Sequence, residues 1–335
     1  MITEPLSLSV VSPCFSEEQV LPEFLRRTRA VCDSLDLPYE IVIVDDGSGD
    51  RTWSIISEAA AADPRILGMR LRRNHGHQLA LSAGIAATKG AMVLLIDSDL
   101  QDPPELLPAM IERLCVEGAD VVYGQRRRRA GDSLFKRATA AAFYRLIDLL
   151  SDVPIPRDTG DFRLISREVA DLLCRMPERH RFVRGMIAWV GGRQVPFPYD
   201  RCPRGAGSTK YPLRRMVRFA VDAITGFSRR PLQAATLFGI AAVFFSIALA
   251  LYSLLGWVSG VAVPGWTSLM SAVGFLSALQ FLMLGMLGEY LGRLYEESQG
   301  RPLFLEAGRV GSGLAIGERT RVRSERELPH AAIRD

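Results

Sequence analysis

Apolar runs and helical stretches alternate along the chain from Leu6 to Tyr123. The apolar runs predict strands at Leu6–Val11, Tyr39–Asp46, Ile66–Leu71, Ala91–Ile96 and Ala119–Tyr123. The stretches between them predict helices at Glu17–Leu35, Thr52–Ala62, Gly76–Thr88 and Leu106–Glu117. Because the strands are apolar without interruption and alternate with helices, we predict an α/β fold with a mainly parallel sheet and helices on both faces.

A different pattern begins at Pro231, because no Asp, Glu, Lys, Arg or His occurs from there until Glu289. A membrane-spanning helix needs about 20 apolar residues. Leu232–Trp257 and Ser268–Gly288 are both long enough, and turn-forming glycine and proline lie between them. We therefore predict a two-helix transmembrane hairpin over residues 231–293. The alternative is a helix pair buried in a soluble core, but core helices seldom lack charge for so long.

The placement of arginines predicts how the hairpin is oriented. Arg229 and Arg230 precede it, Arg293 and Arg301 lie at its other end, and the loop between the helices has none. Since positively charged flanks stay on the cytoplasmic side, we expect a multi-pass protein whose N-terminal domain and C-terminal tail are both cytoplasmic.

Two stretches before the hairpin, 133–147 and 212–227, mix basic and apolar residues and could lie in the headgroup layer as amphipathic helices. For each, the alternative is an ordinary surface helix. The predicted organisation is a globular domain over 1–210, a juxtamembrane helix over 211–230, the hairpin over 231–293 and a tail over 294–335. We expect the tail to be mobile from Ala307 onward, because it is charged and contains glycine.

Composition narrows the classes of function. The chain has 335 residues, and its formal net charge of +4 is too small to imply a nucleic-acid partner. Its five cysteines are scattered without a CxxC pair, which argues against a disulfide framework and a zinc site and fits a reducing compartment. The N-terminus lacks the pattern of a signal peptide. The sequence contains no GxGxxG or GxxxxGK[ST] motif, which argues against a dinucleotide fold and a P-loop.

Acidic residues gather where predicted strands end. Asp45 and Asp46 end the second strand, and Asp97 and Asp99 follow the fourth. The carboxyl ends of parallel strands meet at one rim, where such sheets bind ligands. Converging carboxylates repel unless a cation joins them, and Mg²⁺ or Mn²⁺ prefers oxygen ligands and bridges phosphates. Each motif taken alone could instead be a polar turn or a helix cap.

Side-chain alternation along an extended chain would point residues 97, 99 and 101 the same way. We therefore predict Asp97, Asp99 and Gln101 as metal ligands. His75 and His77 lie two residues apart with no further histidine nearby, so we expect them to have a structural role near the third helix.

Several longer motifs carry a family resemblance. They are Pro13-Cys-Phe-Ser-Glu-Glu18, Val44-Asp-Asp-Gly-Ser48, Arg73-Asn74-x-Gly76, Asp97-Ser-Asp-Leu-Gln-Asp-Pro-Pro104 and Gly160-Asp-Phe-Arg163. With them the chain resembles family 2 (GT-A fold) glycosyltransferases, which bind nucleotide sugars. More narrowly, it is similar to polyprenyl-phosphate glycosyltransferases such as dolichol-phosphate mannose synthase and the bacterial undecaprenyl-phosphate glucosyltransferases. The match runs from about Ser7 to Arg293, although the family usually carries Asn where this chain has Ser16.

The resemblance implies a set of site residues. The nucleotide pocket would be lined by Pro13, Glu17, Asp45, Asp46 and Asp97. Mg²⁺ or Mn²⁺ on the diphosphate would be held by Asp97, Asp99 and Gln101. The lipid phosphate and the diphosphate would be bound by Arg126, Arg137, Arg204 and Lys210. The catalytic set would be Asp99, Asp161 and Arg163, of which Asp161 has the alternative role of a helix cap.

The implied reaction is inverting transfer of a sugar from a nucleotide sugar, UDP-glucose first, to undecaprenyl phosphate at the bacterial inner membrane. UDP-N-acetylhexosamine, UDP-aminoarabinose and GDP-mannose are alternative donors, and a non-catalytic membrane scaffold is a more distant alternative. No strong base is expected, because the attacking phosphate is already ionised. The implied partners are the donor, the lipid acceptor and the bilayer, and the resemblance suggests a homotetramer.

Overall fold

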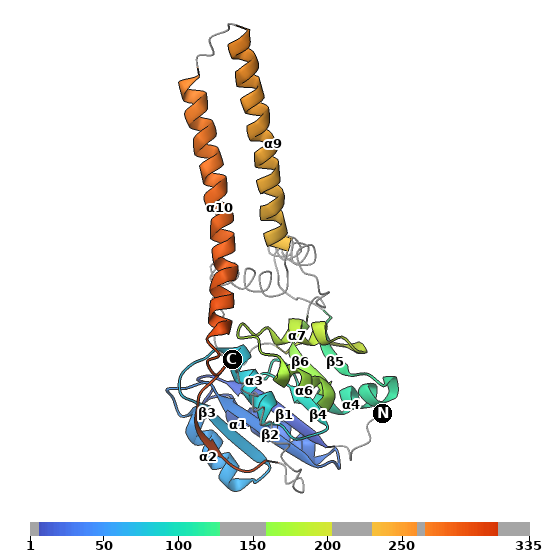
Figure 1. Ribbon diagram of the computed structural model, residues 1–335. Helices are drawn as coiled ribbons and strands as arrows, with labels where there is room; N and C mark the ends of the chain where they lie inside the picture. The colour runs from blue at the N-terminus through green and yellow to red at the C-terminus, as the bar shows by residue number, and fades with distance from the viewer. Residues whose placement is uncertain (1–6, 128–158, 203–229, 260–264, 314–335) are drawn as a thin grey trace, which may run out of the picture.

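The computed structural model describes residues 7–127, 159–202, 230–259 and 265–313 (Figure 1). An eight-stranded sheet in the order β7-β5-β6-β4-β1-β2-β3-β8 forms the centre of the globular part. Its strands are β1 (Leu8–Cys14), β2 (Tyr39–Asp45), β3 (Ile66–Leu71), β4 (Met92–Leu95), β5 (Val121–Arg126), β6 (Thr159–Ser166), β7 (Gln194–Tyr199) and β8 (Glu306–Val310). The pairings β1–β2, β1–β4, β2–β3 and β5–β7 are parallel, so the predicted mainly parallel α/β sheet is confirmed.

Helices cover both faces of this sheet. One face packs against α1 (Leu21–Asp33), α2 (Thr52–Ala62) and α4 (Leu107–Glu117), which follows the short 3₁₀ turn η1 (Pro104–Leu106). The other face packs against α3 (His77–Ala87), α6 (Arg167–Arg175) and α7 (Val183–Val190). Val10 and Val11, neighbours in β1, are buried in opposite layers. Continuous apolar strands are therefore needed because both faces of the sheet are covered.

The pattern of apolar residues did not predict β6. Thr159–Ser166 lies antiparallel between β4 and β5, with Phe162 in one core layer and Ile165 in the other. Asp161 and Arg163 consequently lie inside the sheet. The alternative that Asp161 caps a helix is wrong, because the cap of α6 is Ser166, whose hydroxyl accepts a hydrogen bond from the N–H of Val169.

The predicted mobile tail is also wrong for part of its length. Glu306–Val310 forms β8, which pairs antiparallel with β3 and takes the edge position of the sheet. The C-terminal segment therefore belongs to the sheet, and the globular domain is not confined to residues 1–210. Pairing satisfies the backbone groups that an exposed edge strand would leave open, which stabilises this segment despite its charge.

Two long helices extend away from the sheet side by side (Figure 1). They are α9 (Arg230–Val258) and α10 (Trp266–Ser298), which match the two predicted apolar segments in position. In the part of the chain that the structure describes, one helical segment, Ala272–Ser298, is long and apolar enough to cross a membrane. Large apolar side chains such as Phe244, Phe275 and Phe281 are more than half exposed along the pair.

Close packing of α3 on the sheet provides a first testable prediction. A methyl group at Gly84 would lie 2.4 Å from Cγ1 of Val11 and 3.1 Å from Cγ2 of Val44. Gly84→Ala is therefore expected to destabilise the protein by about 1–3 kcal/mol, because overpacking forces the helix off the sheet. Gly49→Ala is the control, since its methyl group would meet nothing within 4 Å. Equal melting temperatures for the two variants would contradict this packing.

Candidate active site

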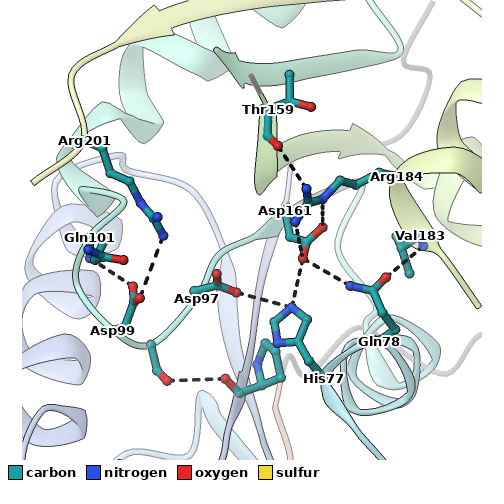
Figure 2. A network of polar contacts seen from close by, with 12 residues as sticks. His77, Gln78, Asp97, Asp99, Gln101, Thr159, Asp161, Val183, Arg184 and Arg201 are labelled. Atoms are coloured by element: carbon teal, nitrogen blue, oxygen red, sulfur yellow. Dashed lines mark hydrogen bonds and ion pairs between the residues drawn. The ribbon is translucent and has the colours of Figure 1, made fainter. Parts of the chain in front are cut away.

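Polar side chains from distant parts of the sequence converge at the rim where β1, β2, β4 and β5 end (Figure 2). The segments after β2 and β4 bring the predicted acids to this rim. The antiparallel strand β6 begins here and contributes Asp161. Residues after β3 and β7 also reach the same place, as Figure 2 shows for His77 and Arg201.

The segment after β4 is a turn and not an extended chain. The strand ends at Leu95, and Leu100 has a positive φ of 57°. Residues 97, 99 and 101 therefore do not alternate as we expected. Asp99 accepts a hydrogen bond from the backbone N–H of Gln101 at 3.0 Å, whereas Asp97 faces the α3 side of the site (Figure 2). The expectation that all three side chains point the same way is wrong, because alternation requires extended backbone.

Asp161 is the centre of the densest polar cluster. Its carboxylate, which is 5% exposed, accepts a 2.6 Å hydrogen bond from Nε of Arg184 and a 3.2 Å bond from the side-chain amide of Gln78. Nε2 of His77 lies 3.0 Å from Oδ2 of Asp161. Burial alone would raise the pKa of Asp161, but Arg184 and His77 hold it well below its usual range. Asp161 therefore fixes the guanidinium of Arg184 and the imidazole of His77.

Asp97 has the opposite electrostatic setting. Burial raises its pKa to about 6, with further contributions from Asp161 and two other carboxylates, although the charge of His77 works against this shift. Oδ1 of Asp97 lies 3.5 Å from Nε2 of His77 and accepts no hydrogen bond from the described residues. For His77 itself, burial is the largest influence and opposes protonation, but the hydrogen bond to Asp161 and the charges of Asp97 and Asp161 together outweigh it and raise the pKa.

Asp99 lies on the other side of the rim, beside β7. Nη2 of Arg201 approaches its carboxylate to 3.8 Å, and Nε of the same guanidinium lies 3.3 Å from Asp102. Asp102 is fully buried and accepts a hydrogen bond from the hydroxyl of Tyr199. Arg201 therefore lies between the carboxylates of Asp99 and Asp102.

Two of the residues predicted to line a nucleotide pocket, Asp45 and Asp46, lie at the end of β2. Asp45 accepts a hydrogen bond from the N–H of Ser48 at 2.9 Å, and Nε of Arg70 lies 3.4 Å from its other oxygen. Asp46 accepts hydrogen bonds from the N–H groups of His75 and Gly76, at 2.7 Å and 2.9 Å. Burial nevertheless raises the pKa of Asp46. The two acids thus hold the loops after β2 and β3 together.

Comparison with known proteins identifies the family. The model of glycosyl transferase family 2 matches residues 9–173. The prophage bactoprenol glucosyl transferase homologue of Escherichia coli is 38% identical over 90% of this chain and 98% of that protein. The uncharacterised glycosyltransferase YkcC of Bacillus subtilis is 42% identical over 90% of this chain and 93% of that protein. The chain belongs to glycosyl transferase family 2. The family resemblance is thus confirmed, and the protein is a glycosyltransferase with a GT-A-like sheet.

The acidic rim of this family 2 glycosyltransferase fits a divalent metal ion. Ligand atoms of His77, Asp97 and Asp161 lie within 4.8 Å of one another. An orphaned carboxylate oxygen on Asp97 and its raised pKa are features that a bound cation would relieve. Of the three predicted ligands, this cluster contains Asp97 alone, so Asp97 has structural support and Asp99 stays a proposed ligand on the family resemblance. Gln101 is proposed with them, although the turn at Leu100 removes the geometric reason first given for it.

Other predicted residues of the glycosyltransferase site lie in varied environments. The carbonyl of Pro13 accepts a hydrogen bond from the hydroxyl of Ser98, and the N–H of Glu17 donates to Thr52, so both lie next to the rim. Arg126 is the last residue of β5, and its guanidinium lies close to Gly160. A Cβ added to Gly160 would lie only 2.9 Å from Nη2 of Arg126. The remaining phosphate-binding candidates, Arg137, Arg204 and Lys210, lie outside the described residues. Both predicted amphipathic stretches lie outside them as well.

Arg163 was predicted to shape the site where the sugar meets the acceptor, but its side chain is not exposed to solvent. Its side chain is fully buried, its guanidinium carbon lies 5.9 Å from the centre of the Tyr123 ring, and one nitrogen donates to Thr159 at 3.4 Å. Burial lowers its pKa to about 10, although the charge of Asp161 opposes the shift. These contacts of Arg163 thus join β6 to Tyr123 of β5, and a role in the reaction stays a prediction.

Three functional candidates were missed by sequence reasoning. For His77, the signal was available, because it follows β3 and so reaches the same rim as the predicted acids. Arg184 and Arg201 gave no comparable signal. Each is one arginine among many in the chain, and each meets its acid only through the placement of α7 or β7.

Proposed function

We propose that this glycosyltransferase moves one sugar from a nucleoside diphosphate sugar to undecaprenyl phosphate, with inversion at the anomeric carbon. UDP-glucose is the first-choice donor. The observation that carries the proposal is the 38% identity, over 90% of this chain, to proteins named bactoprenol glucosyl transferase. The apolar helices α9 and α10 follow strand β7 of the GT-A-like sheet in the same chain. Their apolar composition supports an acceptor that resides in a bilayer.

The side chains at the rim have distinct proposed tasks. Asp45 and Asp46 line the nucleotide pocket, and Asp97 with Asp99 holds Mg²⁺ or Mn²⁺. When bound, such an ion neutralises the charge that develops on the departing diphosphate. Arg126 binds the acceptor phosphate, because guanidinium groups match phosphate oxygens in pairs.

The cations around Asp161 support this assignment of roles. Both of its carboxylate oxygens already accept contacts from Arg184 and His77. An acid fixed in this way orients neighbouring groups and holds no spare capacity for a proton. The attacking phosphate is ionised at neutral pH, so the reaction needs no proton acceptor.

The membrane arrangement is part of the same proposal. The absence of charge from Pro231 to Gly288 supports two spans, and the flanking arginines support a cytoplasmic sheet and C-terminus at a bacterial inner membrane. The anchored sheet and the lipid phosphate would then meet in two dimensions, which raises their effective concentration. We include a homo-oligomer in the proposal by family resemblance.

The test is a panel of radiolabelled nucleotide sugars incubated with the full-length protein, undecaprenyl phosphate and Mn²⁺ or Mg²⁺. We expect UDP-glucose to give one glycosylated lipid with an inverted anomeric centre. Preferred incorporation from UDP-N-acetylhexosamine, UDP-aminoarabinose or GDP-mannose would replace the donor but keep the reaction. If no sugar of the panel reaches the lipid, the proposed acceptor is wrong.

A further inference from the structure

The end of α10 and the chain that follows it run along the whole edge of the sheet. We call residues 296–313 the C-terminal strap. Beyond Ser298, the strap packs Phe304 against the core layer of α3, α6 and α7, and then forms β8 beside β3. At the opposite end of β3, the carbonyl of Ser312 accepts a hydrogen bond from Nζ of Lys89 at 3.3 Å. The strap thus connects a long apolar helix to both ends of β3.

The strap packs tightly against the backbone of β3 at Gly311. Gly311 has a φ of 78°, which residues with a side chain rarely adopt. A Cβ at this position would lie 2.0 Å from the carbonyl oxygen of Ile66, which is backbone and cannot move aside. At Gly308, which lies within β8, a Cβ would come no closer than 3.9 Å to Trp53. A methyl group would therefore clash with the backbone at Gly311 and fit without a clash at Gly308.

One contact of the strap reaches the loop that holds His77. The N–H of Arg72 donates to the carbonyl of Leu305 at 2.9 Å, directly before this loop begins. The loop then gives the N–H groups of His75 and Gly76 to Asp46 and places His77 against Asp161. The strap therefore fixes the point from which this loop leaves the sheet.

A second set of contacts reaches the segment that holds Arg184. Nε2 of His180 lies 2.9 Å from a carboxylate oxygen of Glu296. Nη1 of Arg179 donates to the carbonyl of Arg301 at 2.6 Å. A few residues later, α7 begins and Arg184 forms its hydrogen bonds to Asp161. The strap thus touches both segments that supply a cation to Asp161, one from each side.

We propose that the C-terminal strap is a positioning element that holds His77 and Arg184 on Asp161 and thereby couples membrane attachment to the geometry of the donor pocket. The inference rests on the proposed function only for the statement that this rim binds the donor. Loops fixed at one end alone sample more conformations, and a displacement of about 1 Å at a reacting site costs up to about a hundredfold in rate. Detaching the strap should therefore loosen two loops that it touches and weaken catalysis without removing any reacting group.

The experiment compares full-length Gly311→Ala with full-length Gly308→Ala in detergent micelles. Hydrogen exchange read by mass spectrometry reports on peptides that cover β8, residues 72–78 and residues 178–184. In Gly311→Ala we expect amide exchange at least about tenfold faster in all three regions, because clash with Ile66 releases β8. In Gly308→Ala we expect wild-type exchange.

Activity provides the second measurement. We expect kcat of Gly311→Ala to fall about tenfold or more, while Gly308→Ala stays within about twofold of wild type. Faster exchange of β8 with unchanged exchange in residues 72–78 and 178–184 would overturn the proposal, since the strap would then be released without effect on the site. Unchanged exchange of β8 in Gly311→Ala would overturn it as well, because the close fit at Ile66 would be absent. Exchange needs no substrate, so failure of the proposed acceptor remains distinguishable.

Discussion

Asp99→Asn is expected to lower kcat/KM for sugar transfer by about 10²–10³-fold. The substitution keeps the size of the side chain but removes the charge that we assign to metal binding. Loss of a group that stabilises developing negative charge typically costs about this much in rate. The fold should survive, because Asp99 lies in a turn and the isosteric amide can still accept the hydrogen bond from the N–H of Gln101.

Two measurements distinguish a loss of metal binding in Asp99→Asn from a loss of folded protein. Calorimetry with Mn²⁺ in the presence of UDP should show weakened metal uptake by Asp99→Asn. Glu105→Gln is the matched control, since Glu105 is an acid of the same segment that pairs with Arg27 at the surface. The control should keep wild-type metal uptake and activity. Sugar incorporation by Asp99→Asn at the wild-type rate would remove Asp99 from the proposed metal site.

Arg184→Met is expected to destabilise the protein by about 2–3 kcal/mol and to reduce sugar transfer strongly. Removing one partner of a buried ion pair leaves the other charge uncompensated, which costs about 3–5 kcal/mol when burial is complete. We take a smaller value because Arg184 is 30% exposed and Asp161 retains His77. A fall of about 5–10 °C in the thermal melting temperature would express this loss.

The matched control for this substitution is Arg193→Met. Arg193 is 62% exposed and lies 3.4 Å from Glu117, so its loss should change stability by about 0.5 kcal/mol or less. A double variant, Arg184→Met with Asp161→Asn, should regain part of the melting temperature, because the buried charge is then gone. It should not regain activity. Equal melting temperatures for Arg184→Met and Arg193→Met would show that Asp161 does not depend on Arg184.

Much of the fold followed from periodicity alone. Each of the five strands predicted from apolar runs overlaps an observed strand, because a strand covered on both faces must be apolar throughout. The positions of α9 and α10 followed from the long absence of charge. The family resemblance was equally local, since it was carried by short motifs at strand ends, and the comparisons confirm it.

The errors at β6 and β8 share one cause, which is that both strands depend on neighbours remote in sequence. The error after Leu95 came from assuming extended backbone beyond the end of β4. Strand β6 is a strand because it fits between β4 and β5. Strand β8 is ordered because the edge of β3 is open to it. The turn after Leu95 separates Asp97 from Asp99, although an extended chain would have aligned them. Local polarity and glycine content describe none of these relationships.

The sequence by itself determined that a layered α/β sheet precedes a long apolar region, and that acids stand at the ends of parallel strands. Both the layered sheet and the acids at its strand ends can be predicted from short-range patterns. Burial sets which residues of a strand are apolar, and strand direction sets which end of the sheet the following residues reach. Only the tertiary structure decided which cation meets which acid. Arg184 meets Asp161, Arg201 approaches Asp99 and His77 lies between two carboxylates because separate chain segments are packed at one rim. Electrostatic partnership depends on distance in space, and the fold alone sets that distance.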